Sequence, residues 1–218
     1  MSFLKKSYRT IACALITQLL GTFSISPILG TNFLSFNLTH ALTPLTGFFG
    51  NGIHIVVAYM VHTAITGLYG SIGFNLFNHM PTFCGALFLA TDSRFLKASI
   101  STLCIVMFLL HPIGRECAFY TLYWIPPLII SFLPRSPLFI QALGSTLTTH
   151  AVGSILWIYS HNTTVAFWQT LMCCVWIERL LFALVLAGSS YALHISIPFL
   201  KKIVSSKQLR SKLCPTGS

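Results

Sequence analysis

Apolar runs about as long as a membrane-spanning helix recur along this chain from Ile11 to Phe199. A helix needs roughly 20 mostly apolar residues to cross a bilayer. Charged residues make up only 7% of the 218 residues, whereas a soluble domain carries about 25%, so the chain lacks the charge to solvate a globular surface. We therefore predict one integral membrane domain over residues 1–218, an all-α polytopic helical bundle.

The net charge of +10 lies mainly at the two ends of the chain and in short loops. Because Lys and Arg prefer the cytoplasmic side of a membrane, we expect both termini to be cytoplasmic. The partner of this charge is then the lipid bilayer, and not nucleic acid. The basic residues at the ends are Lys5, Lys6, Arg9, Lys201, Lys202, Lys207, Arg210 and Lys212.

Six membrane spans fit the hydropathy and the charge together, and an even number brings both ends to the same side. They cover about Tyr8–Leu29, Pro44–Leu68, Phe95–Leu110, Cys117–Leu133, Leu138–Ser160 and Val165–Ser190. The first is expected to be retained, with a cleaved signal peptide as the alternative. Gly, Asn, His and Pro interrupt the segment Gly70–Asp92, which favours a re-entrant or broken helix. A full crossing of Pro81–Thr91 would instead give seven spans.

The segment His111–Glu116, HPIGRE, brings a histidine, an arginine and one of only three acidic residues between two apolar runs. The charge distribution makes it the outer turn between the third and fourth spans, and Pro134–Pro137 an inner loop. Arg115 breaks the preference for basic residues inside. We therefore predict the rim of a ligand site here, with a plain connecting turn as the alternative.

Two adjacent charges, Glu178 and Arg179, fall well inside the sixth span, where a charge costs about 2.5–3.5 kcal/mol on insertion scales. Neighbours on a helix point about 100° apart, so we predict that they do not simply pair with each other. Each should have a partner on another helix or on a ligand. By depth, His150 could meet Glu178, and His62 could approach Arg179. Structural polar contacts that tie the bundle together are the alternative.

The fifth span carries a stripe of His150, Ser154, Trp157 and His161 at spacings of 4, 3 and 4. These offsets place the four residues on one helix face, which indicates a lined cavity. Small residues beside the stripe would allow another helix to pack closely; they are Gly144, Ser145, Gly153 and Ser154.

On the fourth span, Glu116, Tyr120 and Tyr123 recur at a similar spacing, with Trp124 beside them. They are expected to share a face, although aromatic residues at a span's end also form interface belts. Pro126 and Pro127 remove two amide donors, so the helix should bend there.

Several classes of chemistry lack their sequence patterns. No HExxH, CxxC, paired acidic motif or Gly-rich phosphate loop occurs, and the histidines do not form ligand pairs at matched depths. We therefore expect no enzyme, no cofactor and no metal.

By length, topology and placement of polar residues, the chain resembles the substrate-binding (S) components of energy-coupling factor vitamin transporters. Ala12-Cys13-Ala14 on the first span loosely resembles the small-residue face with which those proteins dock on their transmembrane coupling partner. The resemblance implies capture of a small vitamin-like metabolite from outside, and partnership with a coupling protein and ATPases.

In the site that we predict, the outer loop Gly30–Thr43 is a lid over the outer half of the bundle. The arginine at the mouth suits a carboxylate- or phosphate-bearing ligand. The rim of this site consists of His111, Arg115 and Glu116, and Tyr123 and Trp124 form a stacking surface. The facing span contributes His150, Trp157 and Asn162, and Glu178 and Arg179 form the floor.

Two other classes remain open. One is a stand-alone proton-coupled secondary transporter, with Gly70–Asp92 as a gating element and Glu178 as the proton carrier. The other is a small intramembrane enzyme or an assembly factor.

Overall fold

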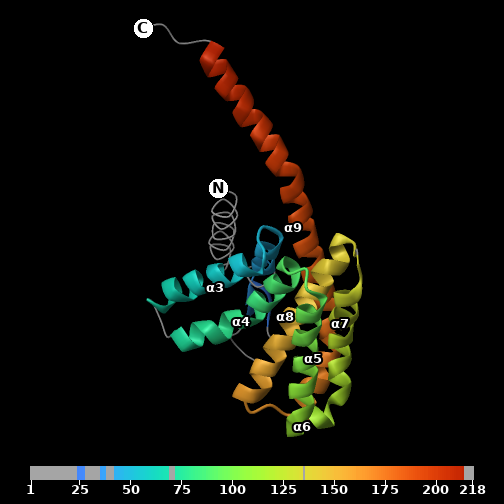
Figure 1. Cartoon of the computed structure of the whole chain (residues 1–218). Helices are drawn as coiled ribbons and strands as arrows, with labels where there is room; N and C mark the ends of the chain where they lie inside the picture. The colour runs from blue at the N-terminus through green and yellow to red at the C-terminus, as the bar shows by residue number, and fades with distance from the viewer. Residues whose placement is uncertain (1–23, 28–34, 38–41, 69–71, 135, 214–218) are drawn as a thin grey trace.

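The computed structural model describes residues 24–27, 35–37, 42–68, 72–134 and 136–213. This part of the chain is mainly helical, which confirms the all-α part of the predicted class (Figure 1). One short antiparallel hairpin joins β1 (Ser24–Pro27) to β2 (Ser35–Asn37). The helices are η2 (Thr43–Phe48), α3 (Gly52–Gly67), α4 (Ile72–Ala90), α5 (Arg94–Leu110), α6 (Pro112–Glu116), η3 (Ala118–Trp124), α7 (Ile125–Phe132), α8 (Leu138–Ser160) and α9 (Val165–Leu213).

The bundle is built around α8, which contacts α4, α5, α7 and α9. Short connections make successive helices antiparallel, so α6 and residues 161–164 lie at one end of the bundle, and the end of α7 and the start of α8 lie at the other (Figure 1). The predicted bounds agree closely for α5 and α8, and the predicted start agrees for α9. α5 begins one residue earlier than expected, α8 has the expected bounds, and α9 begins at Val165 but continues past Ser190.

Local chemistry sets several of these helix ends. The Ser93 hydroxyl oxygen accepts a hydrogen bond from the Leu96 amide at 3.3 Å and caps α5. Pro126 lies in the first turn of α7, where a missing amide donor is tolerated. The fourth span is therefore not one straight helix. It changes from the 3-10 helix η3 to the α-helix α7 beside the two prolines.

The first two predicted spans need correction where the structure describes them. Residues 24–27, expected to end the first helix, form β1, and residues 1–23 lie outside the described residues. The second span is divided, because η2, with Pro44 in its first turn, is separated from the 16-residue helix α3 by residues 49–51. Figure 1 shows α3 and α4 leaving the bundle to one side.

The prediction of a broken helix near residues 70–92 is wrong. α4 is a continuous helix of 19 residues with Pro81 inside it. The Thr82 hydroxyl donates to the His79 carbonyl at 2.9 Å in the turn around the proline. We attribute the unbroken helix to packing on α8, since tertiary contacts can outweigh the roughly 3 kcal/mol that a proline costs a helix interior.

Small residues bring α4 and α8 into close contact, as the sequence predicts. The Ser145 hydroxyl donates to the Gly85 carbonyl at 2.7 Å. A Cβ atom on Gly85 would lie 2.1 Å from the Thr149 hydroxyl oxygen, and one on Gly144 would lie 2.7 Å from the Phe88 ring. The predicted close-packing helix is therefore α4 itself.

An aromatic cluster forms the core between α5, η3 and α9. Phe108 lies at its centre, with ring centroids 5.6 Å from Tyr120, 5.2 Å from Trp124 and 5.1 Å from Trp168. All four side chains are buried, and so is Tyr123. The alternative of an interface belt is therefore wrong for these fourth-span aromatic residues, because the protein itself encloses them.

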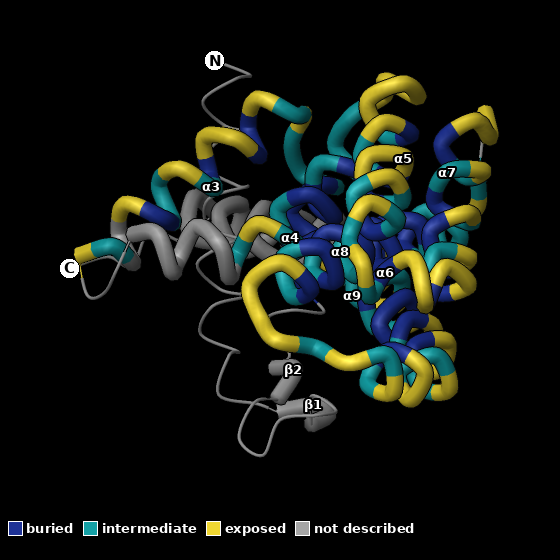
Figure 2. Tube along the Cα trace, turned by 90° about the horizontal axis from the view of Figure 1, so that it is seen from below, coloured by how far each residue is buried: buried dark blue, intermediate teal, exposed yellow. Residues whose placement is uncertain are grey.

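Among the described residues, one helical stretch, Val165–Ser196, is long and apolar enough to cross a membrane. Shorter apolar stretches cover Gly52–Ala64, His79–Ala90 and Ala118–Phe132. Figure 2 shows that the outward sides of α5 and α7 are largely exposed, while the buried positions face inward. Many of the exposed side chains are large and apolar, such as Leu103 and Ile129.

Candidate functional site

Among the Asp, Glu, Lys and Arg residues that the structure describes, Arg179 on α9 is buried, with 2% of its surface exposed. Its guanidinium donates from Nη2 to the Glu178 Oε2 atom at 3.3 Å, and it lies 4.5 Å from the centre of the Phe182 ring. The prediction that the two adjacent charges do not pair is wrong. Their long, flexible side chains bridge the 100° between neighbouring helix positions.

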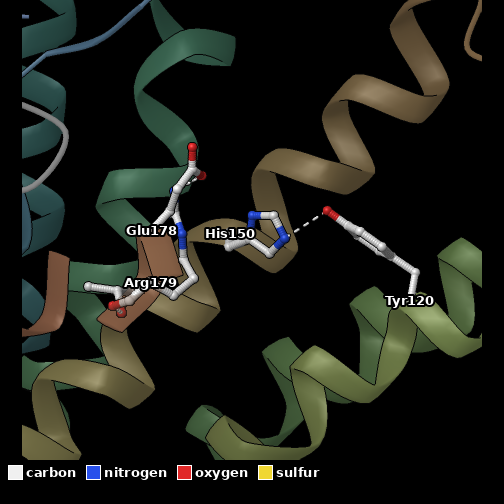
Figure 3. A network of polar contacts seen from close by, with 5 residues as sticks. Tyr120, His150, Glu178 and Arg179 are labelled. Atoms are coloured by element: carbon white, nitrogen blue, oxygen red, sulfur yellow. Dashed lines mark hydrogen bonds and ion pairs between the residues drawn. The ribbon is translucent and has the colours of Figure 1, made fainter. Parts of the chain in front are cut away.

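A second polar contact lies beside this ion pair. His150 Nε2, on α8, is 2.9 Å from the Tyr120 hydroxyl oxygen on η3, and a hydrogen bond joins them. Figure 3 shows the His150 ring between Tyr120 and the Glu178–Arg179 pair. The Arg179 charge acts electrostatically on both His150 and Tyr120. We call Tyr120, His150, Glu178 and Arg179 the interior cluster.

The helices hold the interior cluster through further contacts. The Thr146 hydroxyl group on α8 donates to the Arg179 carbonyl on α9 at 3.4 Å. Tyr123 donates to the Met172 carbonyl and ties η3 to α9. The cluster therefore joins three separate elements. The predicted partners differ: His150 bonds Tyr120, and His62 faces His79, with ring centroids 4.4 Å apart, rather than Arg179.

The predicted outer residues form a separate group at the α6 end of the bundle. Arg115, Glu116 and Asn162 are exposed. The His111 ring lies against Tyr159, with centroids 5.1 Å apart, and its Nδ1 atom is buried with no hydrogen-bond partner. We call His111, Arg115, Glu116 and Asn162 the rim group. Trp157, also half-buried near this end, stacks on His161 at 3.8 Å between ring centroids.

The expected stacking surface is already covered by protein. Trp124 is fully buried against Phe108 and Tyr120, and Tyr123 is buried beside them. Glu116 does not share their face, because it is exposed. A change of helix type explains this difference, since a 3-10 helix turns about 120° per residue and so shifts the faces from their α-helical positions.

The predicted lid does not cover the rim group at its described end. η2, which begins at Thr43, packs through Leu45 against Ala142, Ala183 and Leu186. Ala142 lies in the first turns of α8, at the end of the bundle opposite α6 (Figure 1). The expected position of the lid is therefore wrong at Thr43. Residues 28–34 and 38–41 lie outside the described residues.

The sequence prediction missed a small, partly open cavity of about 40 Å³ between η2, α3 and α4. Two of its histidines, His62 and His79, lie on different helices, so no sequence spacing reveals that they meet. Within the described ranges, no three His, Cys, Asp or Glu side chains are grouped so as to hold a metal ion.

Comparison of the chain with protein-family models, curated proteins and solved structures finds no match. Any proposal about function therefore rests on the structure itself: the interior cluster, the rim group and the cavity.

Proposed function

We propose that this protein is an integral membrane uptake protein that binds a small, anionic, vitamin-like metabolite and works with a separate energising module. In this proposal six helices cross a bacterial inner membrane, both termini are cytoplasmic, and the protein is no enzyme. A transmembrane coupling protein and ATPases are its partners, as in energy-coupling factor transporters. The observation that carries the proposal is Arg179, an arginine enclosed in a bundle whose outer surface is apolar.

The distribution of side chains supports a membrane environment. Large apolar residues are exposed on the helices that surround α8, including Phe95, Leu110, Ile129 and Ile177. Contiguous exposed apolar surface beyond a few hundred Å² indicates a membrane or protein partner. The buried positions instead include hydroxyl-bearing and charged residues, among them Ser101, Ser145, Thr148, Ser154 and Arg179. A bundle with polar groups inside and apolar groups outside suits lipid better than water.

The chemistry of Arg179 supports an anionic ligand. A charge held within a membrane is costly, so such residues are by default candidates for a functional site. A guanidinium group binds carboxylate or phosphate through two parallel hydrogen bonds. Its contact with Glu178, at 3.3 Å, is longer than the usual 2.7–2.9 Å for a charge-assisted bond. In our proposal a ligand anion replaces Glu178 on Arg179, and His150 with Tyr120 supplies neighbouring polar contacts.

Native mass spectrometry of the gently purified full chain tests this proposal. We expect a retained anionic small molecule in the wild type and at least tenfold less of it in Arg179→Lys, because lysine keeps the charge but loses the planar fork. Arg94→Gln is the matched control, since Arg94 is an exposed arginine on α5. Equal retention by Arg179→Lys and the wild type, or an uncharged retained molecule, would contradict the proposal.

Co-purification tests the energising module. A coupling protein and ATPases should accompany the chain from its native membrane. Substrate turnover in detergent by the purified chain alone would overturn the transport proposal in favour of an enzyme.

A second candidate is a stand-alone proton-coupled transporter. The observation that favours it is Glu178, whose side chain is 21% exposed while its partner Arg179 is 3% exposed. A carboxylate at the edge of a buried polar cluster can exchange protons as its ion pair opens. Uptake that persists without any ATPase, collapses with the proton gradient and is lost in Glu178→Gln would select this candidate over the first.

A further inference from the structure

The helix α9 continues well beyond the end of the bundle (Figure 1). The part of it that is long and apolar enough to cross a membrane covers Val165–Ser196. At a rise of 1.5 Å per residue, the 32 residues of this part are about 48 Å long. A bilayer with its headgroup layers is roughly 40–45 Å thick. The apolar part of α9 is therefore long enough to pass through a whole bilayer, and the positions after Ser196 emerge at one of its surfaces.

The part of α9 that follows Ser196, which we call the α9 extension, is basic in sequence. No Asp or Glu follows Glu178 in the chain, so no acidic residue of the extension offsets its cations. The first two basic positions come within two helical turns of Ser196, about 7–9 Å further along the helix axis. This is the depth of the lipid headgroups. The basic residues of the extension are Lys201, Lys202, Lys207, Arg210 and Lys212.

Two further cations lie at the end of the bundle from which α9 leaves. α5 ends beside α6, so its first turn lies at the opposite end, near the point where α9 emerges (Figure 1). Arg94 is exposed there, and its guanidinium carbon is 5.4 Å from the centre of the Phe95 ring. The Lys97 ammonium nitrogen is 5.0 Å from the centre of the Phe88 ring. Asp92, also exposed, offsets one of these two charges.

The α6 end of the bundle has a different balance of charge. Among the residues that the structure describes there, Arg115 stands directly before Glu116, and both side chains are exposed. Residues 161–164, at the same end, include no Lys, Arg, Asp or Glu. The two ends of the bundle therefore differ in sign: the end with the α9 extension is cationic, and the α6 end is balanced.

Anionic headgroups suit this position better than other anions do. Clusters of Lys and Arg that directly follow a membrane-crossing helix attract anionic lipids, and each such residue near the surface strengthens the attraction about fivefold. The attraction falls off within a Debye length of about 8 Å at physiological salt, which Lys201 and Lys202 satisfy. Pro198 stands between the apolar part and these lysines, and proline allows a helix to bend. The more distant cations can therefore turn toward the same surface.

We propose that the α9 extension binds the headgroups of anionic phospholipids, with Lys201 and Lys202 as the main contacts. Arg94 and Lys97 add to the positive potential at this end of the bundle. This inference rests on the membrane location in the proposed function, but not on the metabolite, the energising module or the interior cluster.

Native mass spectrometry of the full chain, released from nanodiscs with equal amounts of phosphatidylcholine and phosphatidylglycerol, tests this inference. We expect the retained lipid to be enriched in phosphatidylglycerol by at least about fivefold, and the enrichment to fall as salt is raised. Equal retention of the two lipids by a membrane-integrated chain would overturn this inference alone. Release of the chain from membranes by alkaline carbonate would instead overturn the membrane location itself.

Two single variants assign the lipid preference to one end of the bundle. Lys201→Gln should lower the enrichment by about two- to fivefold, because one cation at headgroup depth is lost. Arg115→Gln is the matched control, since it removes one positive charge at the α6 end and should leave the enrichment unchanged. Equal losses in the two variants would show an effect of net charge and reject the site. Saturable binding of duplex DNA, together with no preference for phosphatidylglycerol, would assign the extension to nucleic acid instead.

Discussion

The chain contains two adjacent arginine–glutamate pairs in very different surroundings. Arg115 and Glu116 end the short helix α6 and are both exposed. Glu178 and Arg179 lie within α9, where they form an ion pair and Arg179 is enclosed by protein. Water can solvate the first pair, whereas the second must satisfy its charges inside the bundle. Burial, and not residue type, decides which pair the fold depends on.

The glycines of the same two regions show the opposite contrast. A Cβ atom on Gly114, in α6, would lie 1.9 Å from the Phe108 carbonyl oxygen. A Cβ atom on Gly188, in α9, would have no other heavy atom within 4 Å. In the α6 turn, the close backbone contact therefore leaves no room for a side chain at Gly114, whereas the two charged residues are exposed to solvent. In α9, the buried arginine needs an ion-pair partner, whereas position 188 has space for a side chain.

The largest effect should come from Arg179→Leu, which leaves the Glu178 carboxylate without its cation. Breaking a buried ion pair costs about 3–5 kcal/mol, and partial exposure of Glu178 favours the lower end. We expect the free energy of unfolding in mixed micelles to fall by about 3 kcal/mol. The double variant with Glu178→Gln should recover much of the loss. A double variant no more stable than Arg179→Leu would show that the arginine acts through packing.

Gly114→Ala should have the next largest effect, since the methyl group meets backbone at Phe108, the centre of the aromatic cluster. Overpacking of this kind costs about 1–3 kcal/mol, and thermal unfolding followed by tryptophan fluorescence measures it. Gly188→Ala is the control, with stability unchanged or raised by up to about 1 kcal/mol. Equal losses in the two variants would remove the contrast between the regions.

Tyr120→Phe should have a smaller effect, because it removes only the hydroxyl that bonds His150 at 2.9 Å. The expected loss of unfolding free energy is about 1 kcal/mol. A double-mutant cycle with His150→Phe separates the hydrogen bond from packing of the rings. Additive losses would show that the contact contributes nothing beyond packing.

The sequence correctly predicted the helices that have long, continuous apolar patterns. Its predictions failed at positions where contacts between helices determine the structure. The bounds of α5 and α8 follow from hydropathy and from the turns that flank them. Pro81 predicted a break that packing on α8 prevents, and the pairing of Glu178 with Arg179 depends on side-chain flexibility rather than on helix geometry. The small residues of α8 predicted a close helix but could not identify α4 as that helix.

The candidate site was predicted only in part for a related reason. His150, Glu178 and Arg179 were found because charged and polar residues stand out in an apolar sequence. The prediction that Trp124 offers a stacking surface to a ligand failed, because the sequence does not show that Phe108 already packs against that ring. The cavity lined by His62 and His79 depends on how two helices meet, which no local pattern encodes.

The smallest effect should come from Arg115→Ala, the counterpart of Arg179→Leu in the exposed pair. Surface substitutions of this kind usually change stability by no more than about 0.5 kcal/mol, so thermal unfolding should be almost unchanged. As a rim residue with a free path to water, Arg115 should still attract an anion, and its loss should slow ligand association more at low salt than at high salt. Stopped-flow binding at two ionic strengths measures this difference. A stability loss as large as that of Arg179→Leu would mean that exposure does not separate the two pairs, and the contrast between α6 and α9 would fail.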